Sequence, residues 1–583
     1  MVNKLEEARK IINEVDLKMA ELFVQRMKAV EMVYEHKKEF DLPILDPKRE
    51  EAVIERNSAL IEDELLKEYY IDYLKHLMSI SRKYQCQMKN RKTPIMGWAS
   101  WNAFRTDISE DRMKAQADAL ISTGLSKYGY EYFNMDDGFF GGRGEDGILK
   151  FHKNRFPNGI KVVADYAHSL GLKAGIYSEG GKNTCAYYWD NEGDNGVDVG
   201  LYGYEEQDLK MFLEEYGFDF IKVDWCGGQK LGLDEEQQYT KIAKIIDEIR
   251  ERTGRCIVFN ICRWQFPGEW ATKIADSWRT GADIRPTFES LVYQIDNIRS
   301  LARYTSPGHV NDLDMMQVGN GLNHEEEKSH FAMWCMMSTP LMIGCDLTMI
   351  PESTLEILKN EELIAINQDP ACLQAYVAKE IKNDDGTVVG EVWIKNLGCE
   401  QSCEKAVAFF NRSEESVNFK VSLADVGLDG EVISVRDLWE HTDISTGEMM
   451  EVTVEKHCTK VYRVKASKCI PIQNQDDLDD RILEEIKTIS YENMDQLLAS
   501  GGKLIDVRSQ AEYNRSHLKG AINLPYDNIN STMRKENPDK GEKLIVYCSA
   551  GKRSMQARNL MVYMGYQNVY ILKGHEGLLQ TGI

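Results

Sequence analysis

The sequence predicts a multidomain chain made of an all-α unit, a (β/α)8 barrel, an antiparallel β-sandwich and a C-terminal α/β unit. With 583 residues it is too long for one hydrophobic core, because domains hold roughly 100–200 residues. The pattern of apolar residues also changes three times along the chain, from helical to mixed, then to alternating, then back to mixed. We therefore expect domains at residues 1–90, 91–370, 371–470 and 478–583.

The composition is that of a globular protein, and it argues against several kinds of partner. Hydrophobic residues make up 43% and charged residues 28%, unlike a disordered, collagenous or membrane protein. Lys and Arg total 71 against 94 Asp and Glu, a net charge of −23. Such a surface repels phosphate backbones and anionic lipid, so we expect no nucleic-acid partner and no membrane partner.

The first residues and the cysteine usage predict a cytoplasmic location. Residues 1–7 contain no apolar core of signal-peptide length and become acidic at once. No run of about 18 apolar residues occurs that would span a bilayer. The 13 cysteines are scattered and odd in number, which is typical of reduced thiols in a cytosol.

The first unit is predicted to be helical throughout. Residues 4–39 carry a helical repeat of apolar residues, and a repeat longer than about 25 residues indicates a coiled coil or a dimeric helix. Pro43 interrupts this pattern, and two further helices are expected near residues 47–60 and 63–86. The length of the first helix therefore favours a dimer.

The central part alternates short apolar runs with amphipathic helices from Ile95 to about Pro370. This order indicates a parallel sheet, and its length suits an eight-stranded barrel. The helices then stop, and residues 374–467 alternate apolar and polar side chains, as the strands of an antiparallel sandwich do. The clearest predicted barrel strands are residues 132–136, 173–178, 220–226, 256–262 and 341–346.

Aspartates stand at four predicted strand ends of the barrel, where barrel enzymes place their chemistry. A single aspartate there is often only a helix N-cap, but four such ends with aromatic residues between them favour a binding site. A sugar needs aromatic faces for its C–H groups, hydrogen bonds for its hydroxyls and an acid pair at the anomeric carbon. The aspartates are the pair Asp136 and Asp137, then Asp224, Asp283 and Asp314.

Five motifs in this part resemble the family 27 glycoside hydrolases, which comprise α-galactosidases and α-N-acetylgalactosaminidases. The resemblance covers about residues 94–467, and the motifs follow the family's order. It implies a barrel followed by a C-terminal sandwich, and we expect no metal and no other cofactor. The motifs are Met96–Asn102, Met135–Gly138, Ala174–Tyr177, Lys222–Cys226 and Asn311–Met315.

The resemblance implies a retaining double displacement on small α-galactosides. Asp224 matches the nucleophile that forms a covalent glycosyl-enzyme, and Asp283 matches the acid/base. The chemistry needs one carboxylate ionised and one protonated near neutral pH. Lys222 lies two residues before Asp224 on the same strand face, where its charge favours an ionised nucleophile. The residues implied to bind substrate are Trp101, Asp136, Asp137, Tyr177, Lys222, Arg263, Arg279 and Asp314.

Two features depart from the family's pattern. Arg263 lies where the family usually has a glutamate that helps to read the 2-position of the sugar. An α-N-acetylgalactosaminidase therefore stays open beside an α-galactosidase. Secreted relatives join the counterparts of Cys185 and Cys226 by a disulfide beside the site. The sequence leaves open whether this pair forms a disulfide or remains as two thiols.

Basic residues of the first helix fall at informative intervals. Arg26 and Lys37 are eleven residues apart and share one helix face, whereas Arg9 points about 100° away from Arg26. The pattern resembles the all-helical chorismate mutases. This implies chorismate as a second substrate, bound by guanidinium groups and by donors to its ether oxygen. It also implies a homodimer in which Arg9 reaches the other subunit's site. The implied chorismate-binding residues are Arg9, Arg26, Lys37, Asp46, Arg49, Glu50, Ser81 and Gln85.

The last unit carries a candidate reactive thiol. Cys548 follows the predicted strand 544–547 and opens a short loop before a helix. Backbone N–H groups and the cations Lys552 and Arg553 favour the thiolate there. Together with residues 504–525, this loop resembles the single-domain rhodaneses, which implies that Cys548 carries sulfur as a persulfide.

The sequence therefore predicts a fusion enzyme whose largest module is a retaining α-galactosidase. An interpretation of another class makes the barrel a passive scaffold and the mutase or the sulfur carrier the working part. The intact pair Asp224 and Asp283 favours the enzyme.

Overall fold

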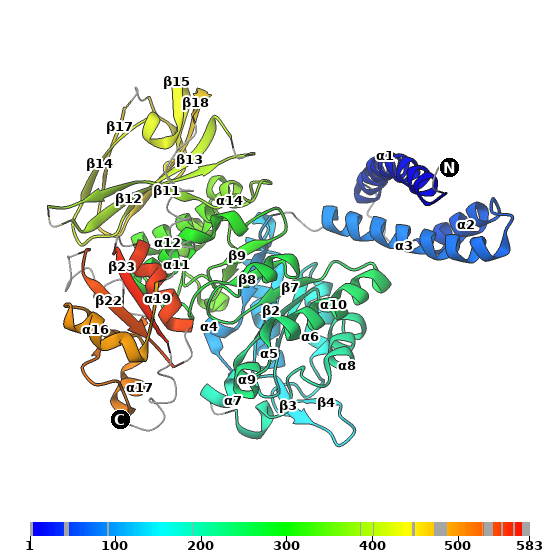
Figure 1. Cartoon of the computed structure of the whole chain (residues 1–583), viewed down its shortest axis with the longest axis horizontal. Helices are drawn as coiled ribbons and strands as arrows, with labels where there is room; N and C mark the ends of the chain where they lie inside the picture. Colours follow the sequence, from blue (N-terminus) through cyan, green and yellow to red (C-terminus); the bar gives the residue numbers. More distant parts are fainter. Residues whose placement is uncertain are drawn as a thin grey trace.

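Figure 1 shows the computed structural model of the chain, in which the first three helices project to one side of the other domains. The predicted fold class is confirmed, because a helical unit, a parallel eight-stranded sheet, a β-sandwich and an α/β unit follow in that order. The structure describes residues 4–39, 46–89, 93–190, 192–384, 386–399, 401–445, 449–470, 487–526, 529, 540–549, 552–563 and 566–573.

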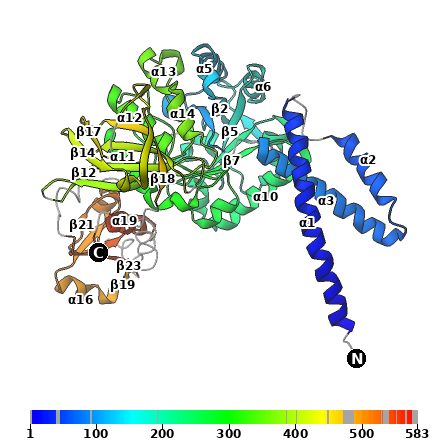
Figure 2. The same ribbon diagram turned by 90° about the horizontal axis from the view of Figure 1, so that it is seen from above.

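The N-terminal unit consists of α1 (Lys4–Glu39), α2 (Pro47–Ser58) and α3 (Glu64–Lys89). Helix α2 begins at Pro47 because Asp46 is its N-cap: the Asp46 carboxylate accepts a hydrogen bond from the Arg49 backbone N–H at 3.1 Å. Proline suits the first helical position, where the missing N–H costs no hydrogen bond. Figure 2 shows that α1 crosses α3 and runs on alone to the N-terminus.

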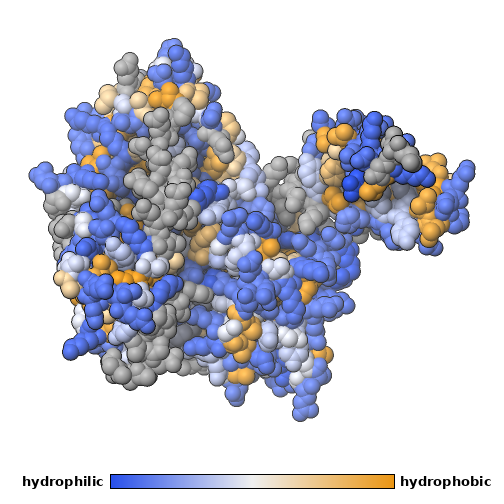
Figure 3. Space-filling model, in the orientation of Figure 1, coloured by the Kyte–Doolittle hydropathy of each residue, from blue (hydrophilic) through white to orange (hydrophobic). Residues whose placement is uncertain are grey.

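The projecting helix α1 leaves many large apolar side chains in solvent, and Figure 3 shows apolar side chains on the surface of this helical unit. Their exposed fractions lie between 42% and 71%. A monomer rarely exposes so much apolar surface without a partner. The residues are Leu5, Ile11, Ile12, Val15, Leu17, Met19, Leu22, Phe23, Val24, Met32 and Val33.

Eight parallel strands form the barrel, in the order β10-β1-β2-β5-β6-β7-β8-β9. A parallel bridge between Met316 and Ile343 closes the ring, with the Met316 N–H donating to the Met342 carbonyl at 2.7 Å. The strands are β1 (Met96–Ala99), β2 (Tyr132–Met135), β5 (Lys173–Glu179), β6 (Phe220–Asp224), β7 (Val258–Ile261), β8 (Ser277–Arg279), β9 (Val310–Asp312) and β10 (Leu341–Ile343).

All five predicted barrel strands differ from the observed ones at an end. Strand β6 ends at Asp224, two residues earlier than expected, because Trp225 is already the N-cap position of α9 (Cys226–Leu231). Strand β7 is shorter than residues 256–262 at both ends. Strands β2 and β10 end one and three residues early, and β5 ends one residue late. The apolar run therefore overestimates most strands, since buried loop residues are as apolar as strand residues.

Helices cover the outside of the barrel, and short elements occupy the loops after its strands. The covering helices are α5 (Glu110–Ser122), α6 (Lys161–Ser169), α8 (Glu205–Leu209), α10 (Glu235–Thr253), α11 (Phe288–Ile298), α12 (His324–Met336), α13 (Glu352–Leu358) and α14 (Glu361–Asn367). The loop elements include α4 (Trp101–Phe104), the hairpin β3 (Phe140–Arg143) and β4 (Leu149–Phe151), and α7 (Cys185–Trp189).

Helix α3 meets the barrel at the amino ends of the strands. Tyr84 of α3 lines a cavity of about 670 Å³ there, together with residues that directly precede or begin barrel strands, such as Ile95, Glu131 and Lys173. The helical unit therefore lies at the face opposite to the carboxyl ends of the strands.

The β-sandwich packs a six-stranded sheet on a two-stranded sheet, and both sheets are antiparallel. Buried ion pairs join it to the barrel: Arg412 contacts Asp296 of α11 at 2.6 Å. The strands are β11 (Tyr376–Lys382), β12 (Val388–Asn396), β13 (Glu404–Asn411), β18 (Thr459–Cys469), β15 (Leu428–Asp437) and β16 (Thr442–Asp443), and then β14 (Val417–Ser422) with β17 (Met449–Val454).

The C-terminal unit is a parallel five-stranded sheet in the order β19-β23-β22-β20-β21. It lies beside α11 of the barrel (Figure 1), where Tyr526 contacts Tyr293. Its described elements are β19 (Lys487–Ser490), α16 (Met494–Ala499), β20 (Lys503–Asp506), α17 (Gln510–Arg515), β21 (Ile522–Asn523), β22 (Lys543–Tyr547), α19 (Lys552–Tyr563) and β23 (Asn568–Lys573). Among the described residues, no helix is both long enough and apolar enough to cross a membrane.

Candidate active site

Three charged side chains from β2 and β6, the strands on either side of β5, meet at the carboxyl ends of the barrel. Asp136 follows β2 and Asp224 ends β6, and both are buried. Lys222 lies between them, with Nζ 2.9 Å from Asp136 Oδ2 and 3.7 Å from Asp224 Oδ1. One ammonium group thus compensates two carboxylates that burial would otherwise destabilise.

Burial controls the protonation of this group. It raises the pKa of Asp224 to about 6, and the charge of Lys222 opposes that rise. Burial lowers the pKa of Lys222, but Asp136 and Asp224 more than compensate, so it lies well above its ordinary value. Asp224 Oδ1 accepts no hydrogen bond from the described residues, so this oxygen is available to a bound molecule.

Asp137 lies beside this group and points toward α7. Its carboxylate accepts hydrogen bonds from the N–H groups of Gly138 at 2.8 Å and Ala186 at 3.2 Å. Burial, together with the charge of Asp136, raises the pKa of Asp137 to about 7. The pair Asp136 and Asp137 is therefore fixed by the loops around it, as a binding pair needs to be.

A second acidic group surrounds Arg279 at the end of β8. The Arg279 guanidinium contacts Asp314 at 2.7 Å and Asp283 at 3.2 Å. Asp314 is buried, but 57% of the Asp283 side chain is exposed, against 7% for Asp224. The site thus offers one enclosed and one accessible carboxylate.

The backbone after Asp283 is tied to the barrel. The Ile284 N–H donates to Asp314 Oδ2 at 2.9 Å, and Gln317 donates to the Ile284 carbonyl at 3.0 Å. Asp314 itself has a φ of +86°, a left-handed conformation that is uncommon outside glycine and often marks functional sites. Burial raises the pKa of Asp314 to about 7.

Two aromatic residues of the predicted site flank these groups. Tyr177 is buried on β5, and its ring lies 5.3 Å from Lys222 Nζ. Its hydroxyl accepts a hydrogen bond from the Cys185 N–H at 3.4 Å. Trp101 begins α4, where it is partly exposed and carries the Arg105 guanidinium 4.7 Å from its ring centre.

Arg263 is paired with an acidic residue, although its sequence position predicted a cation that contacts the substrate. It is buried two residues after β7 and forms an ion pair with Glu235 at the start of α10. Burial lowers its pKa to about 10. Its Nε makes no hydrogen bond, so one buried donor remains for a ligand or a water molecule.

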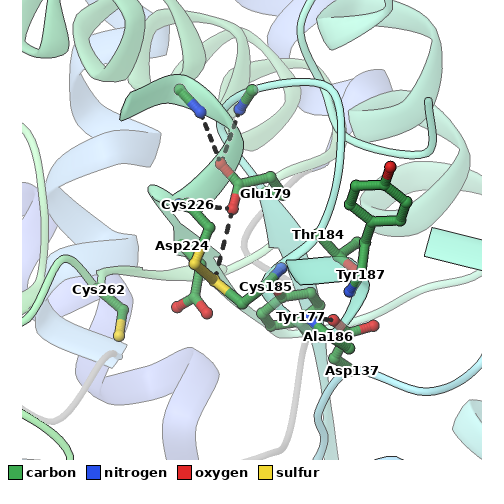
Figure 4. The surroundings of a disulfide bond; sticks show 12 residues. Asp137, Tyr177, Glu179, Thr184, Cys185, Ala186, Tyr187, Asp224, Cys226 and Cys262 are labelled. Carbon is green, nitrogen blue, oxygen red and sulfur yellow. Dashed lines mark hydrogen bonds between the residues drawn. A yellow bond between two sulfur atoms is a disulfide. The ribbon is translucent and has the colours of Figure 1, made fainter. Parts of the chain in front are cut away.

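A disulfide joins Cys185 of α7 to Cys226 of α9 and decides the question that the sequence left open (Figure 4). Cys226 lies two residues after Asp224, so the disulfide links the loop after β5 to the segment that follows Asp224, the nucleophile candidate. Both sulfur atoms lie near the Glu179 carboxylate, within 4.8 Å. They are bonded to each other and offer no thiolate to a metal ion.

Glu179 is a site residue that the sequence interpretation missed. It ends β5, is fully buried, and accepts hydrogen bonds from the N–H groups of Gly181 at 2.9 Å, Cys226 at 2.9 Å and Gly228 at 3.2 Å (Figure 4). Burial, and next Asp224, raise its pKa to about 8. The only signal was an acidic residue two positions after Tyr177 at the end of a predicted strand.

The helical unit brings together part of the predicted chorismate site. Arg26 donates to Ser81 across α1 and α3, and Glu50 forms an ion pair with Arg82 at 2.5 Å. Burial lowers the pKa of Lys37, while Asp46 and Glu50 raise it, so these charges lie near one another.

The other predicted members of that site fall into three cases. Arg49 is exposed, and its backbone N–H binds the Asp46 cap. The side chain of Gln85 lies outside the described residues. Arg9 stands about 25 Å from Arg26 along the same helix, so it cannot join the Arg26 site within one chain.

Cys548 is buried at the end of β22, where the Ser554 N–H at the start of α19 donates to its Sγ at 3.4 Å. The predicted cation Arg553 forms two hydrogen bonds of 2.7 Å with Glu512. The pair lowers the pKa of Glu512 to about 2, so part of the expected positive charge is compensated. The side chain of Lys552 lies outside the described residues.

Comparisons with known proteins agree with this architecture. The family model described as "Alpha galactosidase A" matches residues 93–369, and that of the "Alpha galactosidase C-terminal beta sandwich domain" matches residues 390–464. "Chorismate mutase type II" matches residues 8–86, and the "Rhodanese-like domain" matches residues 490–575.

The chain is 38% identical to Alpha-galactosidase 2 of Arabidopsis thaliana, over 64% of this chain and 90% of that one. The chain belongs to the α-galactosidase family. Alpha-galactosidase A of Cellvibrio japonicus is 34% identical over 67% of this chain and 96% of its own. The crystal structure of α-galactosidase I from Mortierella vinacea matches with a TM-score of 0.57 at 27% identity, over 66% of this chain and 99% of that one. The three resemblances found in the sequence are thereby confirmed.

The hydrogen bonds of the buried Glu179 should contribute to the folding stability of this α-galactosidase family member. Glu179→Gln replaces one accepting oxygen by an amide nitrogen, so at least one of three backbone N–H groups loses its partner. The free energy of unfolding should fall by about 1–3 kcal/mol. Glu179 loses its proton near pH 8 in the folded protein, but near pH 4.5 in the unfolded chain. This group therefore destabilises the folded protein progressively as pH rises from about 4.5 to about 8.

Glutamine does not titrate, so the variant should lose less stability than the wild type between about pH 5 and about pH 8. Urea unfolding at both pH values measures this. Glu248→Gln on the exposed face of α10 is the matched control. An unchanged pH dependence in Glu179→Gln would contradict the buried, protonated carboxyl.

Proposed function

We propose that the barrel hydrolyses terminal α-linked galactose from small α-galactosides with retention of configuration. The observation that carries the proposal is the enclosed pair Asp136 and Asp224, compensated by Lys222, beside the accessible carboxylate of Asp283. The similarity to α-galactosidases at 34–38% identity supports the same substrate.

The two carboxylates suit different steps of a double displacement. Asp224 attacks the anomeric carbon, which its unbonded Oδ1 allows, and Lys222 favours its ionised form. Asp283 protonates the leaving oxygen and then takes a proton from water. Its exposure suits both tasks, because the aglycone and the water must reach it.

The remaining site residues orient the sugar. Asp136 and Asp137 are fixed acceptors for two hydroxyls, and Trp101 and Tyr177 supply apolar faces for C–H groups. Arg263, paired with Glu235, presents its buried Nε as a donor. A donor suits a 2-hydroxyl or a 2-acetamido carbonyl, so an α-N-acetylgalactosaminidase is the alternative that a test must include.

The flanking units supply two further activities in this proposal. The helical unit rearranges chorismate as a homodimer, because Arg9 can complete an Arg26 site only from another chain. The exposed apolar face of α1 supports that assembly. The C-terminal unit carries sulfur on Cys548, held at the start of α19.

We place the chain in the cytoplasm. Ten described cysteines lie outside any disulfide, as expected for a reducing compartment. The Cys185–Cys226 disulfide is buried between α7 and α9, where reductants have little access to it.

Three single changes should each abolish one activity and spare the other two, since the sites lie in separate domains. Asp224→Asn should lower the hydrolysis of nitrophenyl α-galactoside by roughly 10⁴–10⁶-fold, as the loss of a covalent nucleophile does. Arg26→Ala should remove chorismate turnover, and Cys548→Ser should remove sulfur transfer from thiosulfate to cyanide. Each variant is measured in all three assays.

Parallel loss of all activities in one variant would indicate misfolding and contradict separate sites. Hydrolysis of nitrophenyl α-N-acetylgalactosaminide in preference to the galactoside would favour the alternative substrate. Wild-type protein that cleaves neither glycoside would favour the passive scaffold.

Removal of the cation beside the nucleophile should move the pH profile. Lys222 lowers the pKa of Asp224, which nevertheless lies at about 6. In Lys222→Met the pKa of Asp224 should rise further, so the acid limb of kcat/KM should move to higher pH, because the protonated nucleophile is inactive. The position of the limb is read from kcat/KM between about pH 4 and pH 9, with Lys244→Met as the control. A limb that stays or moves to lower pH would contradict this assignment.

Shared active sites should be visible in mixed dimers. Arg9→Ala and Arg26→Ala should each be nearly inactive toward chorismate as homodimers. When the two variants are mixed and allowed to exchange, each hybrid has one site with both arginines and one with neither. About a quarter of the wild-type activity should return at equal mixing, because half of the dimers are hybrids. Mixtures that recover nothing would show that Arg9 does not act across subunits.

A further inference from the structure

The loop that carries Asp283 rests directly on helix α11. Gln294 of α11 donates a hydrogen bond of 2.5 Å to the carbonyl of Ala282, the residue before Asp283. Gly281 lies against the same helix: a Cβ there would stand 2.3 Å from Gln294 Oε1 and 2.7 Å from Asn297 Nδ2. A side chain at this position would have to displace both amides, so the two amide side chains pack directly on the backbone that leads into Asp283.

An adjoining side of α11 is covered by the C-terminal domain. Tyr293 of α11 is 7% exposed and belongs to the apolar core of that domain. Tyr526 packs edge-on against it, with ring centres 5.5 Å apart. The Tyr526 hydroxyl also donates a hydrogen bond of 2.7 Å to Asn297 Oδ1.

The same core reaches the loop itself, because Ala282 packs against it as well. The loop is therefore held between two elements on its amino-terminal side, α11 and the C-terminal domain. On the carboxyl side of Asp283, the backbone N–H and carbonyl of Ile284 form hydrogen bonds with the barrel residues Asp314 and Gln317. Part of the support of Asp283 thus involves a domain outside the barrel.

We propose that the C-terminal domain positions the acid/base Asp283, with Tyr526 as the positioning residue. The Tyr526 hydroxyl fixes one end of the Asn297 amide, and the other end of that amide abuts Gly281. Together with Gln294, this fixes the backbone that presents Asp283 to the leaving oxygen. The inference rests on the proposed glycosidase function and assigns a second role to a domain that resembles a sulfur carrier.

Displacement of an acid/base has a signature that general damage to the site lacks. A general acid must stand within hydrogen-bond reach of the oxygen that it protonates. A sugar alkoxide leaves only with that proton, whereas dinitrophenolate is stable enough to leave without it. Because kcat/KM reports the first bond-breaking step, a displaced Asp283 should slow the cleavage of a disaccharide α-galactoside and spare an activated aryl α-galactoside.

Tyr526→Phe removes the hydroxyl and keeps the ring packed on Tyr293. We expect kcat/KM for melibiose to fall roughly three- to tenfold, part of the 10²–10⁴-fold that general acid–base groups contribute. For 2,4-dinitrophenyl α-galactoside it should change less than about twofold. The control is Tyr513→Phe in the same domain, whose hydroxyl donates to the nearby Ala521 carbonyl at 2.7 Å. This control should leave the ratio of the two substrates at the wild-type value.

A ratio that is unchanged in Tyr526→Phe, or an equal fall for both substrates, would overturn the proposal. Hydrogen exchange of the backbone from residue 279 to 287 provides a measurement that does not require activity. It should become faster in Tyr526→Phe and not in Tyr513→Phe, and equal protection would also overturn the proposal. Wild-type protein that cleaves neither substrate would refute the glycosidase function, while faster exchange in that case would still show the mechanical coupling.

Discussion

The ammonium group of Lys222 is the interaction on which the catalytic centre depends. Asp136 after β2 and Asp224 at the end of β6 both approach it, and its charge opposes the rise that burial causes in the pKa of Asp224. Bringing these three charges together constrains the fold, because residues on one strand share a face only when they are an even number of positions apart. Lys222 and Asp224 must therefore stand two apart on β6, and β2 and β6 must each pair with β5 in the register that brings Asp136 alongside Lys222. A shift of one residue in either strand would turn these side chains into the barrel wall.

Much of this could be predicted from the sequence, because the decisive features are local. The alternation of apolar runs and amphipathic helices indicates a parallel barrel, and the aspartates at strand ends mark the face that carries the chemistry. Glu179 could not be recognised, because its role comes from three N–H groups in two loops that meet only in the folded chain. The partner of Arg263 was equally hidden, since Glu235 is remote in sequence and reads as an ordinary first-turn acid of a helix. Recognising such residues requires the distances between loops, and the pattern of apolar and polar residues along the chain does not contain those distances.

The two carboxylates of the proposed mechanism are supported in different ways. Asp224 is embedded in the barrel, its loop is fastened by the Cys185–Cys226 disulfide, and its surroundings belong to one domain. Asp283 sits on an exposed loop whose stability comes from α11, and α11 also contacts the sandwich through Asp296 and the C-terminal domain through Tyr293 and Asn297. Helix α11 of the barrel thus contacts both the sandwich and the C-terminal domain. If Asp283 is positioned as proposed, changes at their interfaces should affect proton transfer by Asp283 more than attack by Asp224.

The position of α3 at the amino ends of the barrel strands has a consequence for how such chains are assembled. In a parallel barrel every strand starts at one face and delivers its functional side chains to the other, so a segment joined ahead of β1 emerges on the side remote from the sugar. A module joined to the barrel before Ile95 can therefore be added or exchanged without reaching the carboxyl ends of the strands, where the catalytic residues lie. Two barrels joined through their N-terminal helices would keep both mouths open to bulk substrate, whatever the orientation of the helical stalk.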